Sequence, residues 1–193
     1  MEVGTTDEKR VAVIIGSTRP TRICAGIADW ARDALREDSD LDYDLLDLAE
    51  VGLPFLDEPR KAALQQYEHE HTRAWSRRVQ SYHGFFFVFP QYNWGYPGVL
   101  KNALDYLYWE WRDRPASLLT YGTHGGNRGA EQLIGVLHGL HMQLLDTHVE
   151  AVITDQDVDE NWQLRDLDAT LHPNRELLRK IGTEMARALD SNS

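Results

Sequence analysis

A loop rich in aromatic and amide side chains follows the most apolar run of the chain. The run is GFFFVF at residues 84–89, and the loop is PQYNWGYP at residues 90–97. A short run without polar residues is typical of a strand buried on both faces of a parallel sheet. Ligands of open α/β sheets bind at the carboxyl ends of the strands, where this loop begins. Flat rings beside amide groups suit a flat heteroaromatic ligand, although an ordinary aromatic-rich strand-to-helix connection would have the same composition.

A second loop, GSTRPTR at residues 16–22, follows an apolar run at residues 11–15 and precedes a helical pattern. Backbone N–H groups and the positive end of a helix dipole would face this loop, and both attract phosphate. Ser17 supplies a hydroxyl, and Arg19 or Arg22 could pair with a doubly charged group. The glycine-lysine ending of a P-loop and the second and third glycines of the dinucleotide fingerprint are missing, which favours a terminal monophosphate. The alternative is a helix start with solvated arginines.

A third loop, YGTHGGNRG at residues 121–129, follows the apolar run at residues 116–121. Its glycines allow the backbone to approach a ligand closely. We expect Asn127 to cap the following helix, so that N–H groups point at the ligand and stabilise negative charge that develops on it. Any of the three loops alone could be an ordinary turn. Together they follow the first, third and fourth strands, at one edge of the predicted sheet.

The apolar pattern alternates between strands and helices along the chain. We expect strands at 11–15, 41–48, 85–89, 116–121 and 149–153, helices at 25–36, 62–81, 98–111, 127–140 and 171–189, and polar loops at 51–59 and 155–168. This order predicts a doubly wound, five-stranded parallel sheet with right-handed crossovers and helices on both faces. We expect a flexible tail at residues 1–10 and a single domain at residues 11–190.

The three loops resemble those of the NADPH-dependent FMN reductases, a family with a flavodoxin-like fold, and most closely the yeast-type NAD(P)H-dependent flavin and quinone reductases. The matching motifs are GSTR at 16–19, PQYNWGYP at 90–97 with LKNALD at 100–105, and YGTHGG at 121–126. The resemblance implies that the first loop binds the FMN phosphate, that the second lies along the isoalloxazine ring, and that the third closes its other side. The implied cofactor-binding residues are Ser17, Arg19, Arg22, Ile23, Pro90, Gln91, Tyr92, Asn93, Trp94, Tyr121, Gly122, Thr123 and Gly125.

The resemblance further implies a two-electron flavin oxidoreductase. NADPH or NADH would give hydride to N5 of FMN, and a quinone, a flavin or a similar small acceptor would then take the electrons in a ping-pong mechanism. Because the cofactor carries the chemistry, we expect no catalytic acid, base or nucleophile from the protein. Two alternatives stay open: a flavodoxin-like FMN electron carrier without nicotinamide turnover, which an acidic protein would suit, and a relative that lost the flavin and became a binding module.

The family implies a homodimer or a homotetramer. Four tryptophans exceed what one small core needs, and aromatic side chains are enriched at subunit interfaces. We therefore expect part of this set at an interface: Trp30, Trp75, Trp109 and Trp111.

The composition narrows the class of protein. With 20 basic and 31 acidic side chains the net charge is −11, which disfavours binding to nucleic acid or to an anionic membrane. No apolar run approaches the roughly 20 residues of a membrane-spanning helix, and the polar start is unlike a secretory signal. A single cysteine, Cys24, allows no intrachain disulfide and favours a cytoplasmic setting.

No metal site is expected. His69 and His71 are spaced to point to different faces of a predicted helix. His138 and His141 could meet, but they lack an acidic or cysteine partner. Cys24 lies near a helix start, which could lower its pKa, although a buried small residue is the simpler interpretation.

Overall fold

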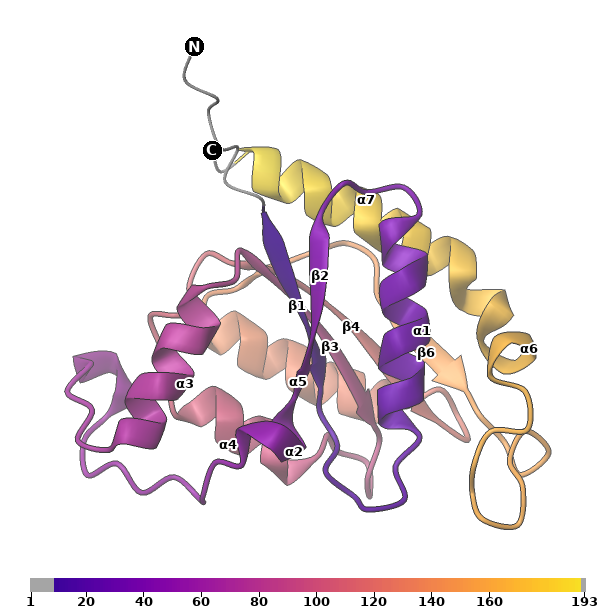
Figure 1. Cartoon of the computed structure of the whole chain (residues 1–193), viewed down its shortest axis with the longest axis horizontal. Helices are drawn as coiled ribbons and strands as arrows, with labels where there is room; N and C mark the ends of the chain where they lie inside the picture. The colour runs from indigo at the N-terminus through magenta and orange to yellow at the C-terminus, as the bar shows by residue number, and fades with distance from the viewer. Residues whose placement is uncertain (1–8, 192–193) are drawn as a thin grey trace.

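The computed structural model describes residues 9–191, and its centre is a parallel sheet (Figure 1). The strands are β1 (Arg10–Ile15), β2 (Asp42–Asp47), β3 (Gly84–Pro90), β4 (Pro115–Gly122), β5 (Gln143–Leu144) and β6 (Val149–Val152), in the order β2-β1-β3-β4-β5. Both β5 and β6 pair with β4, one near its start and the other near its end, so they share the fifth position of the sheet. This is the flavodoxin-like strand order. The tail predicted at residues 1–10 lies, as far as residue 8, outside the described residues.

Helices cover both faces of the sheet (Figure 1). The helices α1 (Cys24–Arg36), α6 (Leu167–Leu171) and α7 (Arg175–Ser191) pack on one face, and α3 (Glu70–Gln80), α4 (Gly98–Asp105) and α5 (Asn127–Gly139) pack on the other. A short helix, α2 (Leu48–Val51), follows β2, and two 3₁₀ turns lie at Ala62–Leu64 and His172–Asn174. Neighbouring residues of β1 and β3 enter opposite apolar cores, which explains why β3 and the part of β1 after Arg10 contain no polar side chains.

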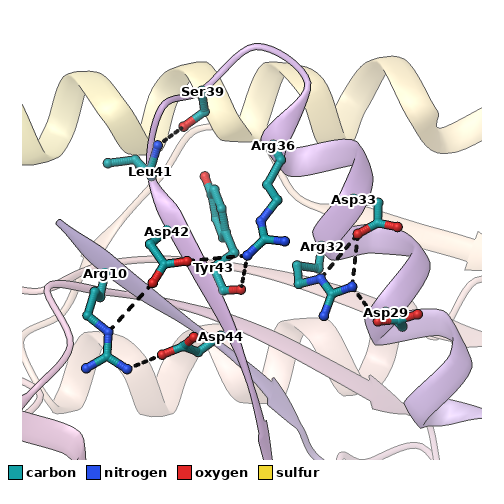
Figure 2. A network of polar contacts seen from close by, with 10 residues as sticks. All are labelled: Arg10, Asp29, Arg32, Asp33, Arg36, Ser39, Leu41, Asp42, Tyr43 and Asp44. Atoms are coloured by element: carbon teal, nitrogen blue, oxygen red, sulfur yellow. Dashed lines mark hydrogen bonds and ion pairs between the residues drawn. The ribbon is translucent and has the colours of Figure 1, made fainter. Parts of the chain in front are cut away.

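The edge strand β2 is held by ion pairs at its amino end (Figure 2). Arg10 of β1 contacts the carboxylates of Asp42 and Asp44, and Arg36 of α1 donates to the carbonyl of Tyr43 at 2.9 Å. The aspartates therefore point to charged partners while the ring of Tyr43 is buried. This network lies at the opposite end of the strands from the predicted ligand loops, and its role is structural.

The helix predicted at 62–81 is wrong in its first half, because α3 begins only at Glu70. The carboxylate of Glu58 accepts the backbone N–H groups of Glu68 and His69 at 2.9 and 3.1 Å, which holds this stretch extended. The hydroxyl of Tyr67 donates to the buried Glu110 at 3.0 Å. These tertiary hydrogen bonds outweigh the local helical preference.

The helix predicted at 98–111 is also too long, because α4 ends at Asp105. Two buried indoles donate to carbonyls in its last turn: Trp75 to Ala103 at 2.9 Å, and Trp111 to Leu104 at 3.1 Å. The carbonyls at a helix end need such partners. At the C-terminus, the single helix predicted at 171–189 is divided into α6, a 3₁₀ turn and α7. The other predicted strands and helices are present, with ends that differ by a few residues.

Candidate functional site

A cavity of about 310 Å³ lies at the carboxyl ends of β1, β3, β4 and β6. In Figure 1 these strand ends lie at the lower edge of the sheet, where the chain passes from strands to helices. The loops after β1, β3 and β4 all contribute to its wall, as their positions in the sequence predicted. The predicted site residues that line it are Arg19, Arg22, Ile23, Pro90, Gln91, Tyr92, Tyr121, Gly122 and Thr123.

The loop after β1 presents an uncapped helix start to this cavity. Helix α1 begins after Ile23, no side chain caps its first N–H groups, and its first turn holds no acidic residue. The positive end of the helix is therefore free of internal compensation, which favours an anion there. Ser17 is fully buried, and its hydroxyl lies 2.9 Å from that of Tyr92. This hydroxyl pair joins the first loop to the second.

The two arginines of this loop differ in their surroundings. One guanidinium nitrogen of Arg22 binds the carboxylate of Asp47 at 2.5 Å, which ties the loop to the end of β2. The Nε atom of Arg22 is buried and has no hydrogen-bond partner among residues 9–191, an arrangement that is costly unless another group satisfies it. Arg19 is exposed, and no ion pair of its side chain is found within residues 9–191. The wall of the cavity therefore has one restrained cation, Arg22, and one exposed cation, Arg19.

The loop after β3 is a tight turn with unusual backbone angles. Tyr92 and Gly95 exchange backbone hydrogen bonds of 2.8 and 2.9 Å, and the two residues between them, Asn93 and Trp94, have φ values of 47° and 70°. Asparagine tolerates such angles, but tryptophan rarely adopts them. Helix α5 holds the turn from outside, because Gln132 donates to the carbonyl of Trp94 at 3.1 Å.

The loop after β4 is shaped by glycine. Gly126 has a φ of 78°, and a side chain there would lie 2.4 Å from Thr120 Oγ1. The predicted cap at Asn127 is wrong by one residue: Gly126 occupies the cap position, and Asn127 is the first residue of α5. The left-handed backbone of Gly126 turns the chain sharply into the helix, so no capping side chain is used. Asn127 instead accepts the N–H of Arg128 at 2.9 Å.

Sequence reasoning missed a fourth wall, which the segment after β6 supplies. Ile153, Thr154, Asp155, Val158 and Trp162 all line the cavity. This segment was predicted only as a polar loop. Its one available signal was its place after the fifth strand, at the same edge of the sheet as the other loops. Thr21 of the first loop completes the lining.

Four predicted residues do not line this cavity. Ser17 lies behind Tyr92, Asn93 and Trp94 form the outer turn, and Gly125 lies next to the backbone of Glu150. The indole of Trp94 is exposed and stacks against the guanidinium of Arg128, whose carbon lies 5.4 Å from the ring centre. Their assignment to the cofactor stays a prediction.

Cys24 and Tyr121 form the buried floor beneath the first and third loops. Burial raises the pKa of Cys24 to about 11, despite its place at a helix start, so a lowered pKa is excluded. Burial, with the neighbouring thiol, also raises the pKa of Tyr121. Burial therefore favours the protonated form of both groups at neutral pH.

The histidines are not arranged around a metal. His69 and His71 stack with ring centres 5.1 Å apart, because His69 precedes α3 in extended backbone instead of pointing to another helix face. Both interact with Asp57, and His141 contacts the hydroxyl of Tyr108 at 3.0 Å. No group of three or more metal-ligating side chains occurs in residues 9–191.

The chain matches known proteins over most of its length. The sequence profile of the NADPH-dependent FMN reductases matches residues 9–156. An NAD(P)H-dependent FMN reductase of Schizosaccharomyces pombe is 41% identical over 140 residues, which are 72% of this chain and 70% of the relative. The chain belongs to the NADPH-dependent FMN reductase family. It is therefore an oxidoreductase of the flavoprotein class, and the family name states both FMN and NADPH.

Two further proteins resemble the chain, one in sequence and one in structure. An NADPH:quinone oxidoreductase of Arabidopsis thaliana is 30% identical over 139 residues, which are 68% of this chain and 69% of the relative. The flavoenzyme FerB of Paracoccus denitrificans, an NAD(P)H:(acceptor) oxidoreductase, superposes with a TM-score of 0.70 at 17% identity, covering 95% of this chain and 98% of that one. At that identity the superposition establishes the flavodoxin-like fold alone.

Proposed function

We propose that this protein is an FMN-dependent NAD(P)H oxidoreductase that passes two electrons to a quinone, a flavin or a similar small acceptor. The observation that carries the proposal is that arginines, an aromatic and amide wall and a glycine loop line one cavity at the carboxyl ends of the strands. The family membership supports the same reaction class, and the plant relative is named for a quinone acceptor.

The cationic end of the cavity fits a phosphate monoester. The buried Nε of Arg22 lacks a partner, the start of α1 lacks a cap, and Arg19 and Thr21 line the same region. An anion there would satisfy Arg22 and the free N–H groups at once. This region contains no fingerprint for a pyrophosphate, so FMN fits better than FAD.

Bound FMN supplies the redox chemistry, which is the acceptance of hydride from the nicotinamide and its delivery to the second substrate. The chain's own residues bind and orient the cofactor and exclude water from it. Tyr92 and Pro90 present flat apolar surface on one wall, and Gln91 is fixed there by the N–H of Gly129 at 3.0 Å. The backbone N–H groups of the loop at Gly122 and Thr123 would stabilise negative charge that develops at the ring edge.

The two substrates would use the same face of the cofactor in turn, which is a ping-pong mechanism. No second site with ligand motifs was recognised in the sequence, and donor and acceptor cannot both stack on one face at once. Initial rates against acceptor concentration, measured at several NADPH concentrations, should give parallel double-reciprocal lines. Intersecting lines, with product inhibition typical of a ternary complex, would contradict the shared face but not the flavin assignment.

The alternative of an electron carrier without nicotinamide turnover is less well supported, because the family consists of reductases. Stopped-flow mixing distinguishes the two hypotheses. Rapid bleaching of the bound flavin by NADPH is expected for a reductase and not for an electron carrier. A cytoplasmic setting and a homodimer or homotetramer belong to the same proposal. Within residues 9–191, no helix is long and apolar enough to cross a membrane.

A further inference from the structure

The cavity wall after β6 is a short hairpin at residues 157–165, and the family profile ends before it, at residue 156. Val158 and Leu164 form its antiparallel bridge. The N–H of Asp159 donates to the carbonyl of Gln163 at 2.8 Å, and that of Arg165 to the carbonyl of Asp157 at 2.9 Å. The hairpin is therefore held together by its own backbone hydrogen bonds, although its sequence is polar.

The tip of this hairpin holds an aromatic side chain in a conformation that tryptophan rarely adopts. Trp162 has a φ of 61°, and 64% of its surface is exposed. The carboxylate of Asp159 accepts the N–H groups of Asn161 and Gln163 at 2.8 and 2.9 Å, which fixes the turn around the indole. Strained backbone of this kind persists where the surrounding structure enforces it, and it is concentrated at ligand-binding sites.

The hairpin is also attached to the first ligand loop. The side-chain amide of Gln163 donates to the carbonyl of Thr21 at 3.2 Å, and Val158 is buried in the core beneath. Trp162 lines the same cavity as Arg19, Thr21 and Arg22. The hairpin that carries this exposed indole is therefore held against the loop that contains Arg19, Thr21 and Arg22.

We propose that Trp162 is a cofactor-contacting residue and that the hairpin 157–165 is a retention element for FMN. The inference rests on the proposed function. The indole covers part of the bound cofactor from the side of the cavity that the first three loops leave open, and the bond from Gln163 to Thr21 keeps it there. The turn accepts unfavourable backbone geometry at Trp162 because the side chain is needed at that place.

The test is an FMN titration of the apoprotein, followed by flavin fluorescence, with two substitutions that separate strain from contact. Trp162→Asn removes the ring but suits a left-handed backbone, and Trp162→Phe keeps a ring. Stacking of a ring on an aromatic side chain is worth about tenfold or more in affinity. We expect Trp162→Asn to weaken FMN about tenfold through faster release, while Trp162→Phe stays within about threefold of the wild type.

Two controls make the result specific. Trp109→Ala removes another exposed indole, which lies away from the cavity, and should leave FMN affinity unchanged. The melting temperature of the Trp162→Asn apoprotein should equal or exceed that of the wild type, because the strain is relieved. Unchanged FMN affinity and release in Trp162→Asn would overturn the inference and leave the proposed function intact. Failure of the wild type to bind FMN would overturn the proposed function itself.

Discussion

Arg19 and Arg22 are three positions apart in one loop, yet the fold gives them different tasks. Arg22 is bound to Asp47, so its guanidinium orients the loop, and its Nε has no hydrogen-bond partner among residues 9–191. Arg19 is exposed at the rim of the cavity and can move to meet an incoming phosphate. The two arginines therefore suit different steps: Arg22 shapes the site, and Arg19 adds charge to it.

Replacing Arg19 by alanine tests this division at the level of one side chain. Loss of a charge-assisted hydrogen bond costs about 1.5–3 kcal/mol, so Arg19→Ala should weaken FMN binding about 10- to 100-fold. The melting temperature of the apoprotein should not change, because the side chain is exposed. The measurement is a calorimetric titration with FMN. Arg112→Ala, a surface arginine on the far side of the molecule, serves as the control, and equal affinities for all three proteins would exclude the role of Arg19.

Among the secondary-structure elements, the packing of α7 against α1 depends on one glycine. A methyl group on Gly182 of α7 would lie 2.4 Å from the carbonyl oxygen of Leu35 in α1. Backbone atoms cannot move aside as the end of a side chain can. The close approach therefore decides which residue α7 can carry at this position, although alanine is the better helix former.

Two glycine-to-alanine substitutions should have opposite effects on stability. Gly182→Ala should lower the free energy of unfolding by about 1–3 kcal/mol, since overpacking outweighs the gain in helix propensity. Gly135→Ala in α5, where nothing lies within 4 Å of the added carbon, should raise it by about 0.5–1 kcal/mol. Urea unfolding of the two variants measures both changes. If Gly182→Ala raised the free energy of unfolding instead, α1 and α7 could move apart without destabilising the protein.

At the scale of the whole molecule, the segment between α2 and α3 has several exposed apolar side chains. Phe55 is 89% exposed, and Leu56 and Leu64 are about half exposed. Asn102 holds this segment open, because its side chain binds the carbonyl of Pro54 at 2.7 Å and the N–H of Leu56 at 2.9 Å. Apolar groups fixed outward in this way are typical of an interface between subunits. Part of a set of four tryptophans was predicted at such an interface, and two of the set, Trp75 and Trp111, are buried in the core.

Light scattering after size-exclusion chromatography tests the assembly. We expect the wild type to be a dimer or a tetramer at micromolar concentration, because subunit contact would bury the exposed apolar side chains. The net charge of −11 does not prevent such a contact. Phe55→Asp places a charge in the patch and should shift the protein toward the monomer, while Leu177→Asp, on a different exposed surface, should not. A monomeric wild type would contradict the proposed assembly.

The sequence by itself determined five strands of the parallel sheet and the gathering of three loops at one of its edges. Apolar runs such as 84–89 and glycine or arginine loops such as 16–22 are local signals, and a parallel sheet brings the carboxyl ends of its strands to one edge whatever the details of packing. Family membership could be recognised for the same reason, because the motifs lie in these loops.

Only the tertiary structure decided the ends of α3 and α4, the cap of α5 and the fourth wall of the cavity. Helix α4 stops at Asp105 because the distant indole of Trp75 and the nearby indole of Trp111 bind the carbonyls of its last turn. The hairpin at 157–165 joins the site through a bond between Gln163 and Thr21, which are far apart in the sequence. Such contacts join residues that are distant in the sequence, so local composition cannot predict them.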